Sequence, residues 1–297
     1  EQGINFNNKL LNVLKLIQGW EKRIDTNLDA QNEKFAMDWF ENRLSQVQQE
    51  VDVLLNSFKL SEALKTIYSL IWDDYCSWYL EWIKPGFEQP ISKEVYDKTV
   101  HYLNEMMHML HPFMPFITEE IYHLISPKQD DLCNKIAAPI AQANTDIIAG
   151  GELLKQVISA LRDARNKNQL KPKDTITLHI QTGNTATYKS IESILCKQVN
   201  ATNIAYTNSS IDNTIVVAVE KDKFFIETSI ELDATALKAT LLADLAYQKG
   251  FLESVSKKLS NERFVQNAKP EVVALEQQKQ ADAIARIATI EESLQSL

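Results

Sequence analysis

Glycine is scarce in this chain, with seven residues among 297. Neither GxGxxG nor GxxxxGKS/T can be assembled from them, which excludes the two common glycine-rich cradles for nucleotide phosphates. Cysteine is scarcer still, because only Cys76, Cys133 and Cys196 are present and no CxxC pair exists. This usage argues against a zinc site built on cysteines and favours a reducing compartment, so we expect a cytoplasmic protein.

Long hydrophobic runs and a leader segment are also missing. No apolar run approaches the roughly 20 residues that span a bilayer, so we expect no membrane partner. The opening residues, EQGINFNNKLL, lack the basic region, apolar region and cleavage site of a signal peptide. They also lack an initiating Met, from which we expect a piece of a longer protein.

Positive charge is in deficit, because the formal net charge is −9. Such a balance disfavours nonspecific binding to nucleic acid. Residues 155–173 have a positive local charge. They contain one acidic residue, Asp163, and six basic ones, namely Lys155, Arg162, Arg165, Lys167, Lys171 and Lys173. This basic stretch predicts either a solvated helix face with its following loop or a surface for phosphates, and the residue pattern leaves both open.

The first part of the chain has the apolar spacing of helices. In NNKLLNVLKLI the apolar residues recur at steps of three and four, which makes one apolar face. The same period predicts further helices over residues 35–58, 61–83 and 92–110. Consecutive helices of this kind favour a bundle.

Two prolines, Pro112 and Pro115, interrupt the next apolar run, HPFMPFITEEIY. Neither fits inside a continuous helix, because proline lacks an N–H and clashes with the preceding turn. Proline is well tolerated in a first turn, so the run predicts a break followed by a new helix. We expect the apolar side chains around the prolines to plug the bundle core, namely Phe113, Met114, Phe116 and Ile117.

The pattern changes along the rest of the chain. Residues 126–150 predict a surface excursion, and residues 152–168 predict another helix. After Pro172, alternating polar and apolar residues predict a strand, a helix over 187–199, a second strand and a hairpin that turns at Glu220–Asp222. From Asp233 onward, two narrow apolar stripes predict an antiparallel helical hairpin.

The predicted fold is therefore mainly α. It consists of a helical bundle, a small α+β unit and a C-terminal antiparallel coiled-coil hairpin that projects as an arm. The predicted domains are 1–171 for the bundle, 172–231 for the α+β unit and 232–297 for the arm.

Aromatic residues gather in IWDDYCSWYLEWIKP. Rings at helical spacing could form a stacking platform for bases, but such spacing is more often that of a core, which we favour. Within this stretch, Cys76 is predicted to fill the core and not to act as a nucleophile. Asp73 and Asp74 would raise the pKa of its thiol, and no histidine is placed to activate it.

Two Glu-x-x-His units, Glu105 to His108 and Glu120 to His123, raise the alternative of a di-metal carboxylate site in a bundle. Such a site needs both units on helices that face one another, together with two further glutamates. Here the units are separated by the two prolines, so the pattern favours histidines scattered on helix faces. We predict no metal ligands.

Three motifs resemble a known family. NNKLLNVLKLI, IWDDYCSWYLEWIKP and HPFMPFITEEIYHLI resemble the anticodon-binding helical domain of class I aminoacyl-tRNA synthetases. The WDDYCSWYLEWIKP form is similar to that of the valyl-tRNA synthetases in particular. KKLSNERFVQNAKPEVVALEQQK resembles the loop and flanks of their C-terminal coiled coil, and ISALRDARNKNQLKPKDTITL resembles their basic helix and the strand after it.

This resemblance implies the function of a tRNA-binding C-terminal portion. The HIGH and KMSKS signatures of the ATP site and any counterpart of the editing domain are absent. We therefore expect no cofactor in this chain, and ATP with Mg in a catalytic domain outside it. The full-length protein would attach valine to its tRNA, whereas this fragment alone would be inactive. Valine tRNA is the expected partner, bound by a monomer.

The resemblance also implies contact residues. On the first helix, Asn12, Lys15 and Leu16 match the anticodon-reading positions, although the family often has Arg-Phe where this chain has Lys15-Leu16 and so lacks a stacking ring. Further candidates on the basic stretch and the arm are Arg162, Arg165, Lys167, Lys171, Lys257, Lys258 and Arg263. A helical scaffold that binds protein through its arm remains a competing hypothesis.

Overall fold

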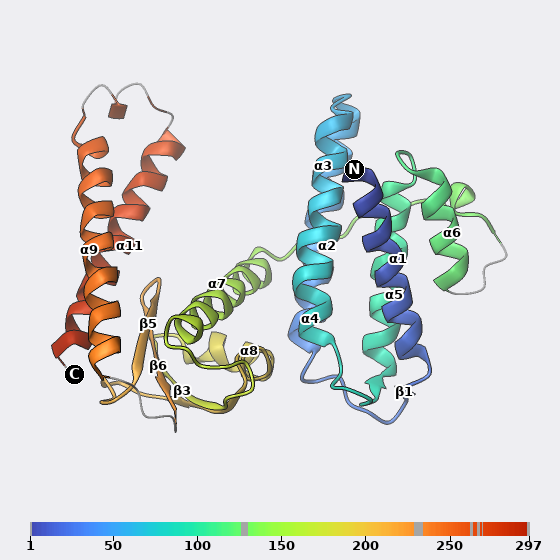
Figure 1. The fold of residues 1–297 in the computed structure, drawn as a ribbon. Coiled ribbons are helices and arrows are strands. Elements are labelled where there is room, and N and C mark those ends of the chain that lie inside the picture. The colour runs from blue at the N-terminus through green and yellow to red at the C-terminus, as the bar shows by residue number, and fades with distance from the viewer. Residues whose placement is uncertain are drawn as a thin grey trace. The chain divides into compact units, whose positions relative to one another are not determined.

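The computed structural model describes residues 2–125, 130–228, 234–261, 264–265, 268 and 270–295. The chain forms two compact units, Glu1–Leu153 and Leu154–Leu297. The first is helical and the second combines a sheet with helices, which confirms the mainly α fold (Figure 1). The three domain ranges drawn from the sequence stay a prediction. No described helix is long and apolar enough to cross a membrane.

The first unit is built from helices that follow one another along the chain. They are α1 (Gln2–Glu21), α2 (Lys34–Asn56), α3 (Leu60–Ser69), the π-helix η1 (Leu70–Tyr79), α4 (Leu80–Ile83), α5 (Lys93–Leu110) and α6 (Pro115–Ile125). Two short parallel strands, β1 (Ile24–Asp25) and β2 (Ile91–Ser92), join the loops beyond α1 and before α5. The helices expected at 35–58 and 92–110 are thus present.

Aromatic rings fill the centre of this bundle. The Phe40 ring lies 4.9–5.1 Å from the rings of Tyr75, Tyr79 and Tyr102, measured between centroids. The Tyr75 hydroxyl donates to the Thr99 carbonyl oxygen at 2.9 Å, and the Tyr79 hydroxyl lies 2.9 Å from the Thr99 hydroxyl. Burial of Tyr75, Tyr79 and Trp82 confirms that most rings of the aromatic stretch are core, whereas Trp72 and Trp78 are half-buried. Burial of the tyrosine hydroxyls is balanced by hydrogen bonds.

Cys76 is buried in the same layer. Desolvation is the main cause that raises the pKa of its thiol, to about 12, and nearby Asp73 adds to the shift. A thiol with such a pKa is protonated at neutral pH. The prediction that Cys76 fills the core is confirmed.

The stretch from Leu60 to Ile83 is less regular than its sequence pattern. Instead of one α-helix it has ten residues of π-helix, η1, between α3 and α4. Within η1 the Ser77 hydroxyl donates to the Trp72 carbonyl oxygen five residues earlier, at 2.9 Å. Asp74 forms an ion pair with Arg43 of α2, with 2.8 Å between Oδ2 and Nε. The wider π turn lets an aspartate enter a face that is otherwise apolar.

The prolines after α5 produce the expected break and restart. Pro115 is the first residue of α6, where its missing N–H is not needed. The expectation that Phe116 plugs the core is wrong, because its side chain is 91% exposed. Phe113, Met114 and Ile117 are half-buried. In the first turn of a new helix, consecutive side chains fan outward, so only some of them face the bundle.

The expected excursion over 126–150 is shorter than predicted. Its described part holds a single 3₁₀ turn, η2 (Leu132–Asn134), and then α7 (Thr145–Lys167) begins. The Asn144 side chain accepts hydrogen bonds from the backbone N–H groups of Asp146 and Ile147, which caps this start. Gly150 and Gly151 therefore lie inside a helix and not in a loop.

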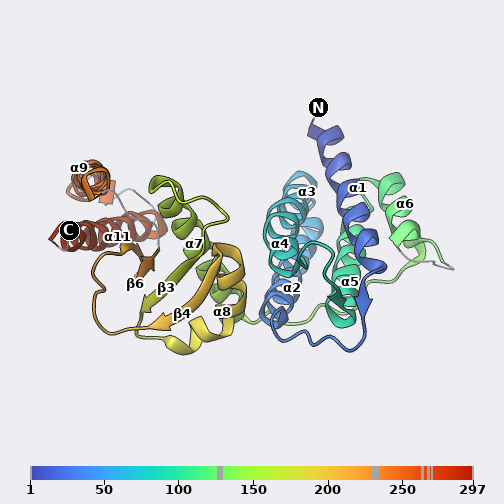
Figure 2. The ribbon, with the colours of Figure 1, turned by 60° about the horizontal axis from the view of Figure 1, so that its bottom comes forward.

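In the second unit, the α+β pattern is confirmed element by element. The elements are β3 (Ile176–Gln181), α8 (Thr185–Val199), β4 (Ala201–Tyr206), β5 (Ile215–Val219) and β6 (Asp222–Glu227). The sheet order is β4-β3-β6-β5, with β3 and β4 parallel and the other neighbours antiparallel (Figure 2). The β5–β6 turn passes through Glu220, whose φ of 53° suits a tight hairpin.

Two long helices, α9 (Ala234–Leu259) and α11 (Pro270–Gln295), follow the sheet and pack side by side (Figure 1). Residue pairs between the two helices show that they are antiparallel, since the residue number on α11 falls as the number on α9 rises. Lys249 pairs with Glu291, the Gln280 side chain donates to Ser256, and Lys258 pairs with Glu276. The predicted helical hairpin is confirmed, and α11 also contacts β5.

Candidate nucleic-acid interface

The candidate residues of α1 lie away from its buried face. Leu10, Leu14 and Ile17 are buried, whereas Asn12 and Lys15 are exposed and Leu16 is half-buried. Three-residue spacing places Asn12 and Lys15 next to each other on one side of the helix. The structure thus brings a hydrogen-bonding amide and a cation together on an accessible surface.

Arg162 of α7 is exposed but already has partners. One of its guanidinium nitrogens donates to the Gln198 carbonyl oxygen at 3.3 Å and to the Gln198 side-chain oxygen at 2.7 Å. An exposed guanidinium has further donors in a planar fork, so it can bind a phosphate while it keeps these contacts.

Arg165, one turn later, has a different environment. Its residue is only 5% exposed, and its guanidinium donates to three backbone carbonyl oxygens, those of Val199 at 2.8 Å and of Lys171 and Asp174 at 2.7 Å each. Desolvation lowers the pKa of Arg165, while the nearby Asp174 carboxylate opposes this shift. These bonds tie α7 to the end of α8 and to the turn before β3.

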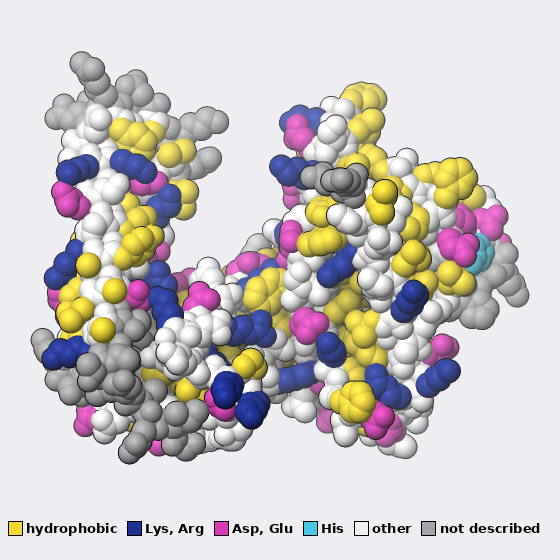
Figure 3. All heavy atoms as spheres, viewed as in Figure 1, with side chains coloured by type: hydrophobic (Ala, Val, Ile, Leu, Met, Phe, Trp, Pro, Cys, Tyr) yellow, Lys and Arg dark blue, Asp and Glu magenta, His cyan; other side chains and the backbone are white. Residues whose placement is uncertain are grey.

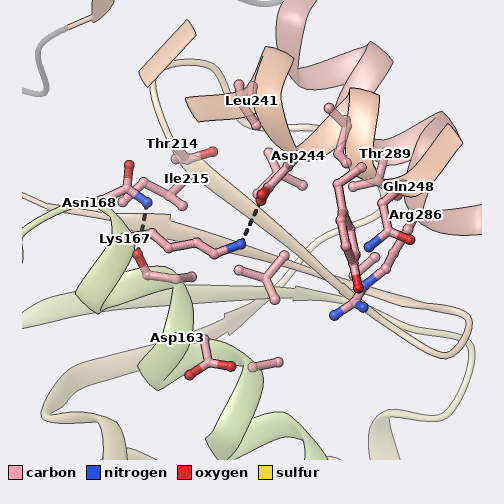
Figure 4. Close-up of a pocket in the computed structure, with 17 residues that line it drawn as sticks. Asp163, Lys167, Asn168, Thr214, Ile215, Leu241, Asp244, Gln248, Arg286 and Thr289 are labelled. Atoms are coloured by element: carbon pink, nitrogen blue, oxygen red, sulfur yellow. Dashed lines mark hydrogen bonds and ion pairs between the residues drawn. The ribbon is translucent and has the colours of Figure 1, made fainter. Parts of the chain in front are cut away.

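Lys167 ends α7 beside the hairpin. Its ammonium nitrogen lies 2.6 Å from Oδ2 of Asp244 on α9 (Figure 4). The pair borders a cavity of about 390 Å³ between α7, β5, α9 and α11. Lys167 therefore links the end of α7 to α9 of the hairpin. Lys171, in the turn that follows, is exposed.

The cavity also contains residues that the sequence patterns did not single out. Arg286 of α11 lines the same space as Lys167 (Figure 4), and so does Tyr247 of α9. They are separated by long stretches of sequence and lie on narrow helical stripes with no motif of their own. Only the packing of α9 against α11, and of α11 against β5, brings them together.

On the arm, the two described candidates lie near the end of α9. Lys257 pairs with Glu253 at 2.7 Å, and Lys258 lies 3.7 Å from Glu276 of α11. Both lysines are exposed, and Lys and Arg side chains alternate with acidic ones along the hairpin (Figure 3). Arg263 lies outside the described residues.

The di-metal alternative is not supported by the positions of its glutamates and histidines. Glu105 is tied to Lys135 at 3.0 Å, and Gln48 donates to it at 3.5 Å. Among the residues that the structure describes, the only group close enough to share a metal ion is Glu119, His123 and Asp131. Neither member of the Glu105–His108 unit belongs to it, so the two units do not combine.

Two protein-family models match the chain. Residues 38–180 match the anticodon-binding domain of tRNA ligases, and residues 233–297 match the tRNA-binding arm of valyl-tRNA synthetases. Valine–tRNA ligases of Phocaeicola vulgatus and Christiangramia forsetii are 38% and 36% identical to it, each over 100% of this chain and 34% of the relative. The chain belongs to the valine–tRNA ligase family.

Similarity to this family extends beyond these two relatives. The valine–tRNA ligase of Bartonella henselae is 29% identical over 93% of this chain and 32% of the relative. The chain thus spans about a third of the length of the valine–tRNA ligases it matches. As a member of this family it carries an anticodon-binding domain, matched from within α2 through α7 into β3, and a tRNA-binding arm, matched over the α9–α11 hairpin.

Proposed function

We propose that this chain holds valine tRNA for a valine–tRNA ligase whose catalytic part lies outside it. The bundle would bind the anticodon end and the α9–α11 hairpin would reach the elbow. One observation carries the proposal: two separate segments of a single chain match two families of tRNA-binding module. A single short motif could match by chance, but two modules in the expected order support one common ligand.

The proposed role is positional. Contacts to phosphates set the register of the RNA, and contacts to unstacked bases supply sequence recognition. ATP with Mg would bind in the catalytic part, where ATP supplies the energy for attaching valine to the tRNA. This chain contributes binding energy and orientation, so we expect it to be inactive alone. We propose that it acts in the cytoplasm as a monomer.

The candidates divide between the two tasks. Asn12, Lys15 and Leu16 form the proposed anticodon contact on α1, where the exposed amide and cation can reach a base edge and a phosphate. The proposed phosphate contacts elsewhere are Arg162, Lys167, Lys171, Lys257, Lys258 and Arg263. Because the guanidinium of Arg165 is buried and bonded to carbonyls, we assign it to holding this surface in shape.

The test is a filter-binding titration of the intact chain with valine tRNA across a salt series. Lys171→Ala should weaken binding and lower the slope of log affinity against log salt by about 1, because one phosphate contact is lost. Lys189→Ala is the matched control, since Lys189 is an exposed lysine of α8 outside the proposed surface. Absence of tRNA binding at low salt, or equal effects of the two variants, contradicts the proposal.

Specificity is tested with a non-cognate tRNA in the same titration. Asn12→Ala should weaken binding to valine tRNA more than to the non-cognate tRNA, because an amide that reads a base carries sequence information and a phosphate contact does not. Lys257→Ala should weaken both equally. If Asn12→Ala weakens binding of both tRNAs equally, α1 does not read the anticodon. The chain would then be a general tRNA-binding module.

A further inference from the structure

Three potential metal ligands converge where α6 ends. Glu119 and His123 lie one turn apart on α6, and Asp131 comes from the segment that returns beyond it. The Nε2 atom of His123 lies 3.1 Å from Oε1 of Glu119 and 3.2 Å from Oδ1 of Asp131. Figure 3 shows histidine and acidic side chains gathered on this part of the surface.

The spacing of these atoms suits a shared cation. All three ligand atoms lie within 4.8 Å of one another. In a tetrahedral zinc site with bonds of about 2.1 Å to nitrogen and oxygen, neighbouring ligand atoms are about 3.4 Å apart. A single Nε2 carries at most one hydrogen, yet it faces two carboxylate oxygens from different segments. One hydrogen cannot satisfy both oxygens well, whereas a cation between the three atoms contacts all of them.

The glutamate is held in place from outside the cluster. Its Oε1 atom also accepts a hydrogen bond from the backbone N–H of Leu132, at 2.7 Å. Leu132 begins the η2 turn directly after Asp131 and is itself buried. The segment that supplies Asp131 is thus fastened to the helix that supplies Glu119, so these ligands are already close without an ion. Such outer hydrogen bonds orient the ligands of natural metal sites.

A second histidine, His111, lines a surface cavity together with Glu119 and His123. The Nδ1 atom of His111 lies 2.8 Å from Oγ1 of Thr118, and that hydroxyl also lies 2.9 Å and 3.2 Å from the carbonyl oxygens of Met114 and Pro115. When the hydroxyl donates to one of these carbonyls, Oγ1 accepts from Nδ1–H, and the lone pair of the neutral imidazole lies on Nε2. Nε2 lies 4.0 Å from Oε2 of Glu119. This is the tautomer that a metal ligand needs.

We propose that Glu119, His123 and Asp131 form a binding site for a divalent transition metal, with Zn²⁺ best suited, and that a shift of the nearby His111 side chain toward the ion makes it the fourth ligand. Two carboxylates and two imidazoles are a donor set that Zn²⁺ accepts in tetrahedral geometry. The two negative charges balance the charge of the ion. The cavity around these residues is open to solvent, so the ion can enter.

The site would have a structural role. The ion would join α6 to the η2 turn, two segments that are otherwise connected by the Glu119–Leu132 hydrogen bond and the His123–Asp131 contact. None of its four residues is among those proposed above for tRNA contact. Metal binding and tRNA binding can therefore be tested with different variants.

The test uses the intact chain and Co²⁺ as a spectroscopic probe for Zn²⁺. One equivalent of Co²⁺ should produce the intense visible absorption of a four-coordinate ion, and Zn²⁺ should displace it. Glu119→Gln, His123→Gln and His111→Gln should each weaken Co²⁺ binding by more than about tenfold, because loss of even an outer partner of a ligand costs about 10–100-fold.

Matched neighbours serve as controls. Glu120→Gln and Asp130→Asn remove the same charge one residue away, and Cys133→Ser removes the thiol that lines the same cavity. Binding by these variants should equal that of the unmodified chain, with far-UV circular dichroism to verify folding. A Co²⁺ spectrum that never develops, or Asp130→Asn and Asp131→Asn variants that lose binding equally, would overturn the site in favour of a diffuse acidic surface. Loss of Co²⁺ binding in Cys133→Ser would show that the thiol is a ligand and that the proposed set of four ligands is wrong.

Discussion

At the scale of single residues, Arg165 shows how burial changes the meaning of a charge. Arg162 and Arg165 look equivalent in sequence, yet only Arg165 is surrounded by carbonyl oxygens. Arg165→Ala should lower the free energy of unfolding by about 3 kcal/mol, because one buried and two part-buried carbonyl oxygens lose a charged donor. Arg162→Ala, at an exposed position, should cost less than about 1 kcal/mol. Urea denaturation followed by circular dichroism measures both, and equal losses would contradict the structural assignment.

The cysteines offer a second residue-scale prediction. With its pKa raised to about 12, Cys76 is a thiolate in only about one molecule in ten thousand at pH 8. Cys133 is exposed. A thiol reagent at pH 8 should therefore label Cys133 rapidly and Cys76 only after denaturant is added. Mass spectrometry of the labelled peptides gives the order in which the two cysteines react. Rapid labelling of Cys76 in the native chain would show that the reagent reaches the core around it.

At the scale of elements, Gly151 allows α7 to approach Trp39 of α2 closely. A Cβ atom on Gly151 would lie 2.0 Å from Cδ1 of Trp39, whereas one on Gly150 would lie 3.3 Å from the nearest atom of Phe35. Alanine within a helix gains about 1 kcal/mol over glycine, but an overpacked core typically loses about 1–3 kcal/mol and sometimes more.

At Gly151 the energetic cost of the clash with Trp39 should exceed the gain in helix propensity, whereas at Gly150 it should not. Gly151→Ala is expected to lower the thermal midpoint by several degrees, since about 1 kcal/mol corresponds to about 2–8 °C for domains of this size range. Gly150→Ala is the matched control and should leave the midpoint nearly unchanged. A midpoint that rises in Gly151→Ala would show that Trp39 can move away without loss.

At the scale of the whole molecule, the two compact units each have their own core. We expect calorimetric unfolding to depart from a single two-state transition, because separate cores are able to melt separately. Ile67→Ala in the first unit and Ile180→Ala in the second each empty a fully buried position and should cost about 2–5 kcal/mol. Each variant should lower one transition and spare the other. If both lower the same transition, the units unfold as one.

The order of helices and strands could be predicted from the sequence because it depends on local periodicity. Strand β3 alternates polar and apolar residues, and its position was predicted. Helix α8 was predicted over 187–199 and begins two residues earlier, at Thr185. The π-helix η1 could not be predicted, since its residues have ordinary helical spacing and its wider turns accommodate Asp74 and its partner Arg43 on another helix. Phe116 was misplaced for a related reason: apolarity alone does not tell which side of a new helix faces the core.

Membership of the valine–tRNA ligase family and the existence of a bundle, an α+β unit and a helical arm were determined by the sequence alone. They rest on motifs and periods that each lie within a short stretch. The tertiary structure alone decided which cations remain accessible, that Lys167 pairs with Asp244, and that Glu119, His123 and Asp131 converge. The physical reason is that solvent access, electrostatic pairing and metal geometry depend on distances between elements, which packing determines after the local pattern has formed each element.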